Sequence, residues 1–280
     1  MCEDEDEDGL EDELQGEGDE SPPNESEQGK CEHVSDPLFK IKDYFYPDCL
    51  ERYVGQEKIK NCLKPILQKA SALKPMPHML LVGPPQAGKK ALAYAIAQEV
   101  GSKIHFYQVT ADMTHPYMCG VMTNLQNSDI LFMNNIHCMP FSVVQSFNTT
   151  IETFKLEIVI DEGDRPIEIN LPKFTVIAAT DKLAFLDSPM AEYYPMVMRL
   201  EAYNQTEQNS IYDVMCDTMC ARIGIKWERD ALFEIVKRSD GTPENVACLL
   251  ERIAPLANIG KSKSITSSVV NYYFQQEAMT

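Results

Sequence analysis

The sequence predicts an α/β fold, in which a parallel sheet carries helices on both faces and is followed by an all-α domain. Three observations support this prediction. Short apolar runs alternate with amphipathic segments between residues 57 and 154, as is typical of strand–helix–strand units. A glycine-containing loop, residues 83–90, follows one of these runs and has the spacing of a phosphate-binding loop. After about residue 203 the remaining segments have the periodicity of helices.

The elements of the sheet region can be placed one by one. Apolar runs bounded by polar or turn residues predict buried strands, and apolar residues three or four positions apart predict helices. The predicted strands are 79–82, 104–109, 130–133 and 174–179, and the predicted helices are 57–70, 91–100, 118–125 and 141–154.

Two later regions depart from this alternation. Segments 156–160 and 167–171 alternate apolar and polar residues on either side of a charged turn that contains Asp161, Glu162, Asp164 and Arg165, which predicts a β-hairpin. The C-terminal part predicts four helices, at 207–222, 230–237, 243–257 and 266–275. We therefore expect three regions: a tail over 1–36, a large domain over 37–203 with the hairpin at 154–171, and a helical lid domain over 204–280.

The charge of the chain is concentrated in the tail. Residues 1–36 hold 16 acidic residues and one lysine, a net of −15 out of −18 for the whole chain, which leaves −3 for the rest. The tail contains too few apolar residues to offset the conformational entropy that it would lose on ordering. We therefore expect it to be a disordered acidic tail. It could serve only solubility, or it could dock on a basic partner or compete with nucleic acid. The nearly neutral body indicates no general DNA-binding surface, so direct DNA binding is not expected, and a local basic patch stays open.

Composition also excludes some classes of protein. No apolar stretch reaches the roughly 18 residues that a membrane span needs, and an acidic N-terminus is unlike a secretory signal. The nine cysteines never occur as C-x-x-C, and no histidine completes a metal site. We expect reduced thiols, no bound structural metal and a cytoplasmic protein.

The phosphate-binding loop is the strongest chemical signal. Its glycines let backbone N–H groups face phosphate oxygens, and Lys89 would reach the β- and γ-phosphates. Lys90 stands where a Ser or Thr hydroxyl normally binds Mg²⁺, and Gln86 replaces a usual glycine and can crowd a phosphate. The expected nucleotide-binding residues of the loop are Gly83, Pro84, Pro85, Gln86, Ala87, Gly88, Lys89 and Lys90.

The apolar strand at 130–133 ends without the acidic pair that usually follows it. Asn134 and Asn135 stand where an Asp would hold Mg²⁺ and a Glu would polarise the attacking water. Asn carries no charge and is a poor partner for a dication. Two explanations are open: the Lys90 ammonium takes the place of the metal and allows Mg²⁺-independent binding of ATP or ADP, or both positions drifted after binding was lost. We expect His137 to be a packing residue.

From Tyr46 to Phe274 the chain resembles RuvB, the AAA+ motor of bacterial Holliday-junction branch migration. The resemblance rests on collinear segments, which are Leu50–Gln56, Met79–Pro85, Met122–Phe132, Phe154–Ile160 with Ile169–Thr175, and Asp240–Glu244. It implies an AAA+ P-loop domain with a helical lid. It also implies an adenine-side segment at Tyr53 and Val54, and a sensor 1 position at Thr180.

The departures from the family pattern fall at catalytic positions. The segment that carries the family's arginine finger is Pro189–Tyr194 here, with Ala191 and Tyr193 and no arginine, and the sensor 2 arginine is Glu244. We leave open whether Tyr193 and Tyr194 stack across a subunit seam or are interior aromatic residues. The family's C-terminal winged-helix domain is expected to be absent, because the sequence stops at Thr280.

These departures favour a catalytically inactive RuvB-like protein. It would act as a scaffold or regulatory subunit through its tail, its hairpin and its AAA+ subunit faces, with an active RuvB-like ring as one candidate partner. Retained Lys89 and Thr180 keep an alternative open, an active ATP-dependent branch-migration motor with a divergent site. A third hypothesis is a nucleotide sensor that binds without turnover.

Overall fold

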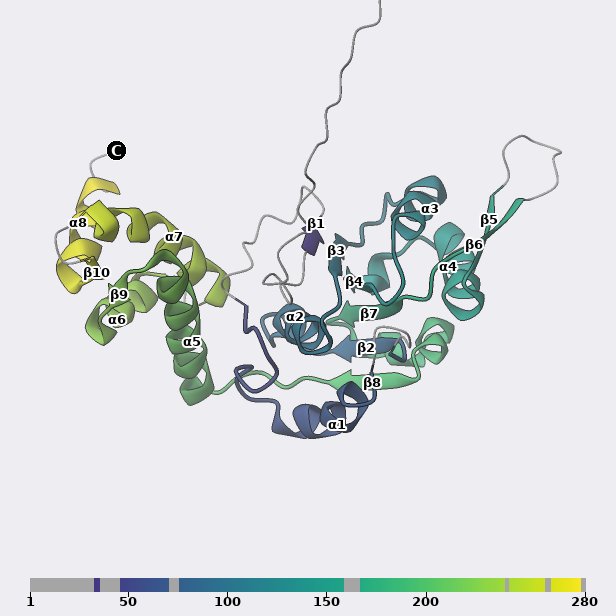
Figure 1. Ribbon diagram of the computed structural model, residues 1–280, viewed down its shortest axis with the longest axis horizontal. Coiled ribbons are helices and arrows are strands. Elements are labelled where there is room, and N and C mark those ends of the chain that lie inside the picture. Colours follow the sequence, from purple (N-terminus) through teal and green to yellow (C-terminus); the bar gives the residue numbers. More distant parts are fainter. Residues whose placement is uncertain are drawn as a thin grey trace, which may run out of the picture. The chain divides into compact units, whose positions relative to one another are not determined.

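The computed structural model describes residues 33–35, 46–70, 76–158, 167–239, 242–259 and 263–277. Its main feature is a parallel sheet with strand order β1-β3-β4-β7-β2-β8 (Figure 1). The strands are β1 His33–Ser35, β2 Met79–Val82, β3 Ile104–Gln108, β4 Ile130–Asn134, β7 Thr175–Thr180 and β8 Met196–Arg199.

The sheet confirms the four strands expected from apolar runs and adds β1 and β8. Sequence reasoning missed β8 because its apolar run, Met196–Met198, has only three residues before Arg199. Val197 is exposed while Met198 is buried against the sheet. Met198 is buried in the core on one face of the sheet, and Met196 packs partly buried against the same core.

Parallel pairing brings the ends of β2, β4 and β7 to one edge of the sheet. In the sheet β7 lies between β4 and β2, and its register pairs Ala179 with Asn134 on one side and Thr180 with Val82 on the other. Loops that follow parallel strands at such an edge are the usual place for a ligand in open α/β sheets. This edge therefore carries the candidate site.

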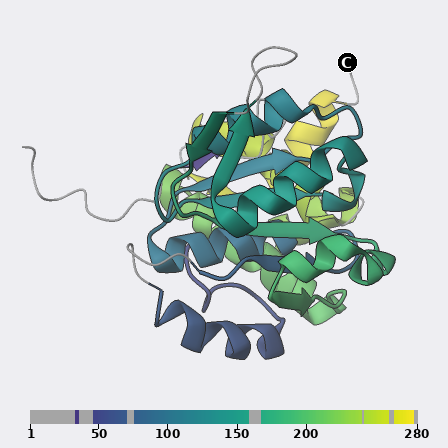
Figure 2. The same ribbon diagram turned by 90° about the vertical axis from the view of Figure 1, so that its right-hand side faces the viewer.

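Alternate residues of each strand enter separate cores on the two faces of the sheet. In β4, Leu131 and Met133 face one core, and Ile130 and Phe132 face the other. The first core includes residues of α3 and α4, and the second includes residues of α1 and α2 (Figure 2). The helices are α1 Glu57–Leu67, α2 Lys89–Val100, α3 His115–Thr123 and α4 Phe141–Thr153, close to the predicted spans.

The predicted hairpin is present next to α4 (Figure 1). Strands β5 Lys155–Ile158 and β6 Ile167–Asn170 pair antiparallel, with Leu156 opposite Ile169. Leu156 is fully buried in the core under the sheet, while Ile167 and Ile169 are exposed. The expected charged tip lies outside the described residues.

The C-terminal part is helical, as expected, and has a core of its own. Its helices are α5 Gln205–Ile223, α6 Arg229–Arg238, α7 Pro243–Ile259 and α8 Ser267–Glu277, and short strands β9 Lys226–Trp227 and β10 Ser264–Ile265 pair beside them. All buried members of this core lie between Tyr212 and Val270. Half-buried Trp227 packs against it, and its Nε1 donates to Asp217 at 2.9 Å. The position of the proposed boundary near residue 203 stays a prediction.

One part of the tail prediction is wrong. Residues His33–Ser35 fall within the range expected to be disordered, yet they form β1 and pair with β3. Without them β3 would be an edge strand with unpaired backbone groups, and such an edge readily accepts an extended segment. The rest of residues 1–36 lies outside the described residues.

No helix in the described ranges is both long and apolar enough to cross a membrane. The described cysteines are free thiols.

Candidate functional site

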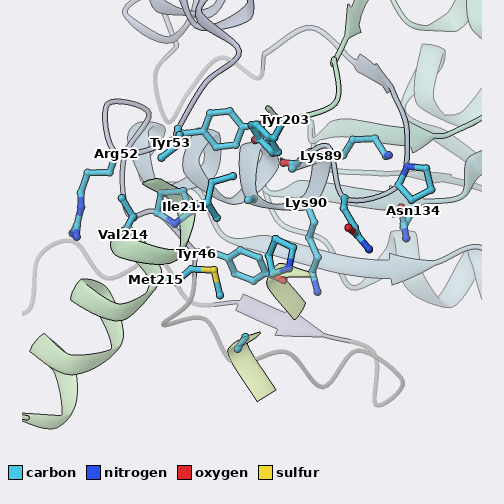
Figure 3. A pocket seen from close by; sticks show the side chains of 18 of the residues that line it. Tyr46, Arg52, Tyr53, Lys89, Lys90, Asn134, Tyr203, Ile211, Val214 and Met215 are labelled. Carbon is cyan, nitrogen blue, oxygen red and sulfur yellow. The ribbon is translucent and has the colours of Figure 1, made fainter. Parts of the chain in front are cut away.

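A cavity of about 750 Å³ opens at the edge of the sheet where the strands end (Figure 3). It combines the phosphate-binding loop, the ends of β3, β4 and β7, and apolar residues from α5 and α7. Among the expected nucleotide-binding residues, those that line it are Tyr53, Val54, Pro85, Gln86, Gly88, Lys89 and Lys90.

The phosphate-binding loop has the backbone conformation that its glycines allow. Gly88 has a φ of +82°, and a Cβ atom there would lie 2.3 Å from the hydroxyl oxygen of Tyr203. Gly83 has no room for a side chain either, because its Cβ would lie 2.7 Å from the carbonyl oxygen of Leu200. Gln86 takes a φ of +63°, a left-handed conformation that costs roughly 1–2 kcal/mol for a residue with a Cβ. The usual glycine at this position would avoid that cost.

Two tyrosine hydroxyls close over the end of this loop. Tyr203 donates to the hydroxyl oxygen of Tyr53 at 2.8 Å, and the Tyr53 hydroxyl lies 3.4 Å from the carbonyl oxygen of Gly88. Burial raises the pKa of Tyr203 to about 12 and raises the pKa of Tyr53 well above its ordinary value. Both rings are therefore neutral near pH 7 and act as hydrogen-bonding groups. Sequence reasoning placed Tyr53 in the site but missed Tyr203, which is 150 residues away.

Lys89 is bent back onto its own loop. Its ammonium donates to the carbonyl oxygens of Gly83 and Pro84, at 2.8 and 2.7 Å. Burial lowers the pKa of Lys89, and the negative charge of Asp181 acts in the opposite direction. Both residues line the cavity, and the backbone N–H of Gly83 donates to the carbonyl oxygen of Thr180 at 3.1 Å, so the residue that precedes Asp181 contacts the start of the phosphate-binding loop.

Lys90 contacts aromatic rings. Its ammonium nitrogen lies 4.7 Å from the ring centre of Phe106 and 5.5 Å from that of Tyr46, both at cation–π range. Figure 3 shows Lys90 and Tyr46 in the cavity. This contact gives Lys90 a packing role between β3 and the segment that carries Tyr46. The hypothesis that its ammonium replaces a metal ion gains no support from this placement.

The end of β4 carries amides in place of acids. The side-chain N–H of Asn134 donates to Oε1 of Gln108 at 2.9 Å, so this amide is tied to the neighbouring strand. Asn135 has a φ of +55°, a left-handed conformation that Asn adopts more readily than most residues. Both side chains line the cavity.

The residues at this edge do not fit Mg²⁺ as a P-loop enzyme would hold it. Such a site needs a hydroxyl at the position of Lys90 and a carboxylate at that of Asn134. Here the first position carries an ammonium that contacts aromatic rings, and the second carries an amide engaged with Gln108. Among the described residues, no group of His, Cys, Asp and Glu could hold a metal ion.

The side chain at the sensor 1 position forms hydrogen bonds with other residues of the protein. Thr180 is completely buried, its hydroxyl lies 2.9 Å from Nδ1 of His137, and it accepts from the backbone N–H of Lys182 at 3.1 Å. Thr180 is not among the residues that line the cavity, whereas the next residue, Asp181, is. The expectation that His137 only packs is too narrow, because its ring also lies 3.8 Å from Oδ1 of Asp181.

Asp181 is a second site residue, besides Tyr203, that sequence reasoning missed. Lys182 Nζ donates to its Oδ2 at 3.3 Å, while Oδ1 is buried and has no hydrogen-bond partner within the described part of the chain. Its pKa is lowered: burial opposes the shift, but the hydrogen bond and charge of Lys182 outweigh it. Asp181 is therefore a carboxylate near pH 7. The residue type alone carried no signal, because an Asp after a strand is also an ordinary turn residue.

The positions that carry arginines in the family, the arginine finger and sensor 2, carry other residues in this chain. Tyr194 is an interior aromatic residue, buried in the core with α3 and α4, and Tyr193 and Ala191 pack partly buried against the same core. This decides the open question about Tyr194 in favour of the interior. Glu244 belongs to the first turn of α7, next to Pro243, which lines the cavity. The placement of the Glu244 side chain lies outside the described residues.

A parallel α/β sheet with a phosphate-binding loop after β2 and a cavity at its strand ends defines a P-loop protein. Residues 45–200, more than half of the chain, match the family described as Holliday junction DNA helicase RuvB P-loop domain. The chain therefore belongs to the RuvB family.

The relatives and solved structures agree with this assignment. The chain is 33% identical over 223 residues to the Holliday junction branch migration complex subunit RuvB of Campylobacter fetus, and 34% identical over 228 residues to that of Pseudothermotoga lettingae. These alignments cover 79% and 80% of this chain but only 64% and 65% of the relatives.

The structure of the Thermotoga maritima RuvB Holliday junction branch migration motor superposes with a TM-score of 0.60 at 26% identity. This match covers 83% of this chain and 72% of that one. It confirms the predicted fold class.

Proposed function

We propose that this chain is a non-hydrolysing RuvB-like subunit that acts through protein contacts as a scaffold or regulator. The observation that carries the proposal is the end of β4, where Asn134 and Asn135 occupy the places of the metal-binding and water-polarising acids. The ring contacts of Lys90 support it, because the second group that would hold the same metal is also replaced. Loss of one such group typically lowers a rate by orders of magnitude.

The intact scaffold supports a retained role rather than decay. Strands β2 and β7 are buried along their whole length, and both glycines of the phosphate-binding loop keep their close contacts. A chain that had lost all selection would not keep these features together with replaced catalytic groups. Binding of ATP or ADP without hydrolysis belongs to the same proposal, because the loop, Lys89 and the cavity remain.

The proposed mode of action follows from how sites form in AAA+ rings. One subunit supplies the phosphate-binding loop and its neighbour supplies the arginine finger. This chain carries Ala191 and Tyr193 in the finger segment, so it would silence its own site and that of a neighbour. The proposed partners are an active RuvB-like ring, through the AAA+ faces, and other proteins, through the hairpin and the acidic tail. A cytoplasmic location is part of this proposal.

Restoring the missing groups tests the proposal. We expect the triple variant Lys90→Thr, Asn134→Asp, Asn135→Glu to gain Mg²⁺-dependent ATP binding, with a Kd at least about tenfold lower in Mg²⁺ than in EDTA, because a hydroxyl and a carboxylate can again hold the metal. We expect Mg²⁺ to give the natural chain no such gain. Equilibrium titration with a fluorescent ATP analogue measures both.

The proposal has a matched control and a clear contrary result. Asn124 lies exposed outside the cavity, so Asn124→Asp adds a carboxylate without adding a metal ligand, and it should gain no Mg²⁺ dependence. If the natural chain bound ATP in a strictly Mg²⁺-dependent way and released phosphate, the alternative of an active motor would replace the proposal.

A further inference from the structure

The carboxylate of Asp181 stands in the part of the cavity where a terminal phosphate would lie. Asp181 follows β7, and β7 lies between β2, which leads into the phosphate-binding loop, and β4, which ends at Asn134. Asp181 lines the cavity together with Lys89 and Asn134, and its charge acts on Lys89. In phosphate-binding loops of this spacing, this lysine reaches the β- and γ-phosphates.

Because Asp181 and Lys89 line the same cavity, the Asp181 carboxylate has an electrostatic effect on a phosphate bound there. The carboxylate repels an approaching phosphate and offsets part of the lysine's attraction for it. Its Oδ1 is buried and has no hydrogen-bond donor within the described residues, so no hydrogen bond offsets the negative charge on this oxygen. Lys182 and His137 approach the carboxylate at 3.3 and 3.8 Å and offset only part of this charge.

In a P-loop enzyme an acid at this edge is neutralised by Mg²⁺ bound between it and the phosphates. Here the usual metal-binding positions carry Lys90, whose ammonium contacts Phe106, and Asn134, whose amide contacts Gln108. The negative charge of Asp181 is therefore not offset by a cation held at that place. The β-phosphate is less affected, because the backbone N–H groups of the loop and the N-terminus of α2 bind it.

We propose that Asp181 makes this cavity selective for a nucleoside diphosphate over a nucleoside triphosphate. This inference rests on the proposed function, since it concerns the same non-hydrolysing site and names the ligand class that the site holds. A triphosphate adds a γ-phosphate with further negative charge next to the Asp181 carboxylate. A diphosphate fills the loop without reaching it.

The test compares ADP and ATP as competitors of a fluorescent ADP analogue on the full chain in EDTA. We expect ADP to bind about tenfold or more tightly than ATP, which corresponds to one close like-charge contact at intermediate dielectric. Asp181→Asn keeps the shape and removes the charge, so it should lower the Kd for ATP about tenfold and change the Kd for ADP less than about threefold.

Two further variants make the result specific. Asp187→Asn removes the same charge from an exposed residue of the neighbouring segment that does not line the cavity, and it should change neither affinity. Asp181→Ser repeats the charge removal with a different side chain in case Asp181→Asn folds poorly. Thermal unfolding identifies any variant that is not folded.

Several outcomes would overturn the inference. These are equal affinity of the natural chain for ADP and ATP, an equal effect of Asp181→Asn on both nucleotides, or no binding of either. If Mg²⁺ promoted ATP binding by the natural chain but not by Asp181→Asn, Asp181 would be a metal ligand, which also contradicts the inference. Phosphate release in the same samples tests the proposed function separately, because a diphosphate preference can fail while the chain remains inactive.

Discussion

Single atoms decide the geometry of the phosphate-binding loop. The hydroxyls of Tyr53 and Tyr203 occupy the space in which a side chain at Gly88 would lie, and the backbone of Leu200 closes on Gly83. The loop is thus held by groups from two distant segments of the chain, one with Tyr53 and the other with Leu200 and Tyr203. Tyr53 is fully buried and cannot easily move aside to admit another side chain.

Gly88→Ala should therefore destabilise the chain more than a similar change elsewhere. Gly101 also has a positive φ, +67°, but a Cβ there would meet nothing within 4 Å, which makes Gly101→Ala a matched control for backbone strain. We expect about 1 kcal/mol of lost unfolding free energy for Gly101→Ala and at least about 2 kcal/mol for Gly88→Ala. Urea unfolding measures both. Equal losses would mean that the tyrosine hydroxyls do not constrain the loop.

His78 links two elements through the two nitrogens of one ring. Its Nδ1 accepts from the backbone N–H of Val176 at 2.9 Å in β7, so Nε2 carries the proton and donates to the carbonyl oxygen of Ile151 at 3.0 Å in α4. Burial lowers the pKa of His78 below its ordinary value of 6.5. Protonation would also place a hydrogen on Nδ1, against the N–H of Val176. The folded chain therefore holds this histidine neutral.

This arrangement predicts a pH dependence of stability. Below the pKa of an unfolded histidine, the unfolded chain binds a proton that the folded chain does not, so the unfolding free energy falls as the pH drops from about 7 toward 5. His78→Asn keeps an acceptor for Val176 but does not titrate, so it should lose this part of the pH dependence. Chemical denaturation at several pH values gives the two slopes, and identical slopes would contradict the assignment.

At the scale of elements, the hairpin has one side that stabilises the fold and one that is open to solvent. Leu156 on β5 is fully buried, while Ile167 and Ile169 on β6 are exposed. The exposed ion pair between Lys155 and Glu168, at 2.7 Å, contributes at most about 1 kcal/mol. Buried Leu156 and Leu171, with the partly buried Phe154 and Ile158, therefore anchor the hairpin in the core, while the isoleucines of β6 stay exposed.

Substitutions on the two strands should separate these roles. Leu156→Ala should lower the unfolding free energy by about 2–5 kcal/mol, because it removes a fully buried side chain. Ile169→Ser should change it by less than about 0.5 kcal/mol. Denaturant unfolding distinguishes the two cases. If Ile169→Ser were as destabilising as Leu156→Ala, the exposed side of β6 would be part of the core.

Local sequence patterns were sufficient to predict most elements but not the contacts of the site. Apolar periodicity located β2, β4 and the helices, because burial imposes that periodicity wherever an element packs. The roles of Asp181, Tyr203 and His78 depend on contacts between residues far apart in the chain, which no local pattern encodes. Replacements such as Asn134 were visible in the sequence because the motif fixes the position at which an acid is expected.

At the scale of the whole molecule, the proposed subunit would act on a ring. A mixed ring would contain some sites that lack the acids of the β4 end and other sites that lack the arginine finger. We expect the ATPase rate of an active RuvB-type protein to fall as the proportion of this chain rises, while an unrelated protein at equal concentration has no effect. Co-purification and a coupled ATPase assay measure this. Unchanged activity together with no co-purification would contradict a regulatory role on such rings.

The most direct test of the central claim is phosphate release from Mg²⁺-ATP by the purified natural chain, compared with the Lys89→Ala variant. Lys89→Ala removes the only side chain of the loop expected to contact the transferred phosphate, so any genuine activity of this site must depend on it. We expect the two proteins to release phosphate at the same background rate. Turnover by the natural chain that Lys89→Ala abolishes would contradict the central claim and establish an active enzyme.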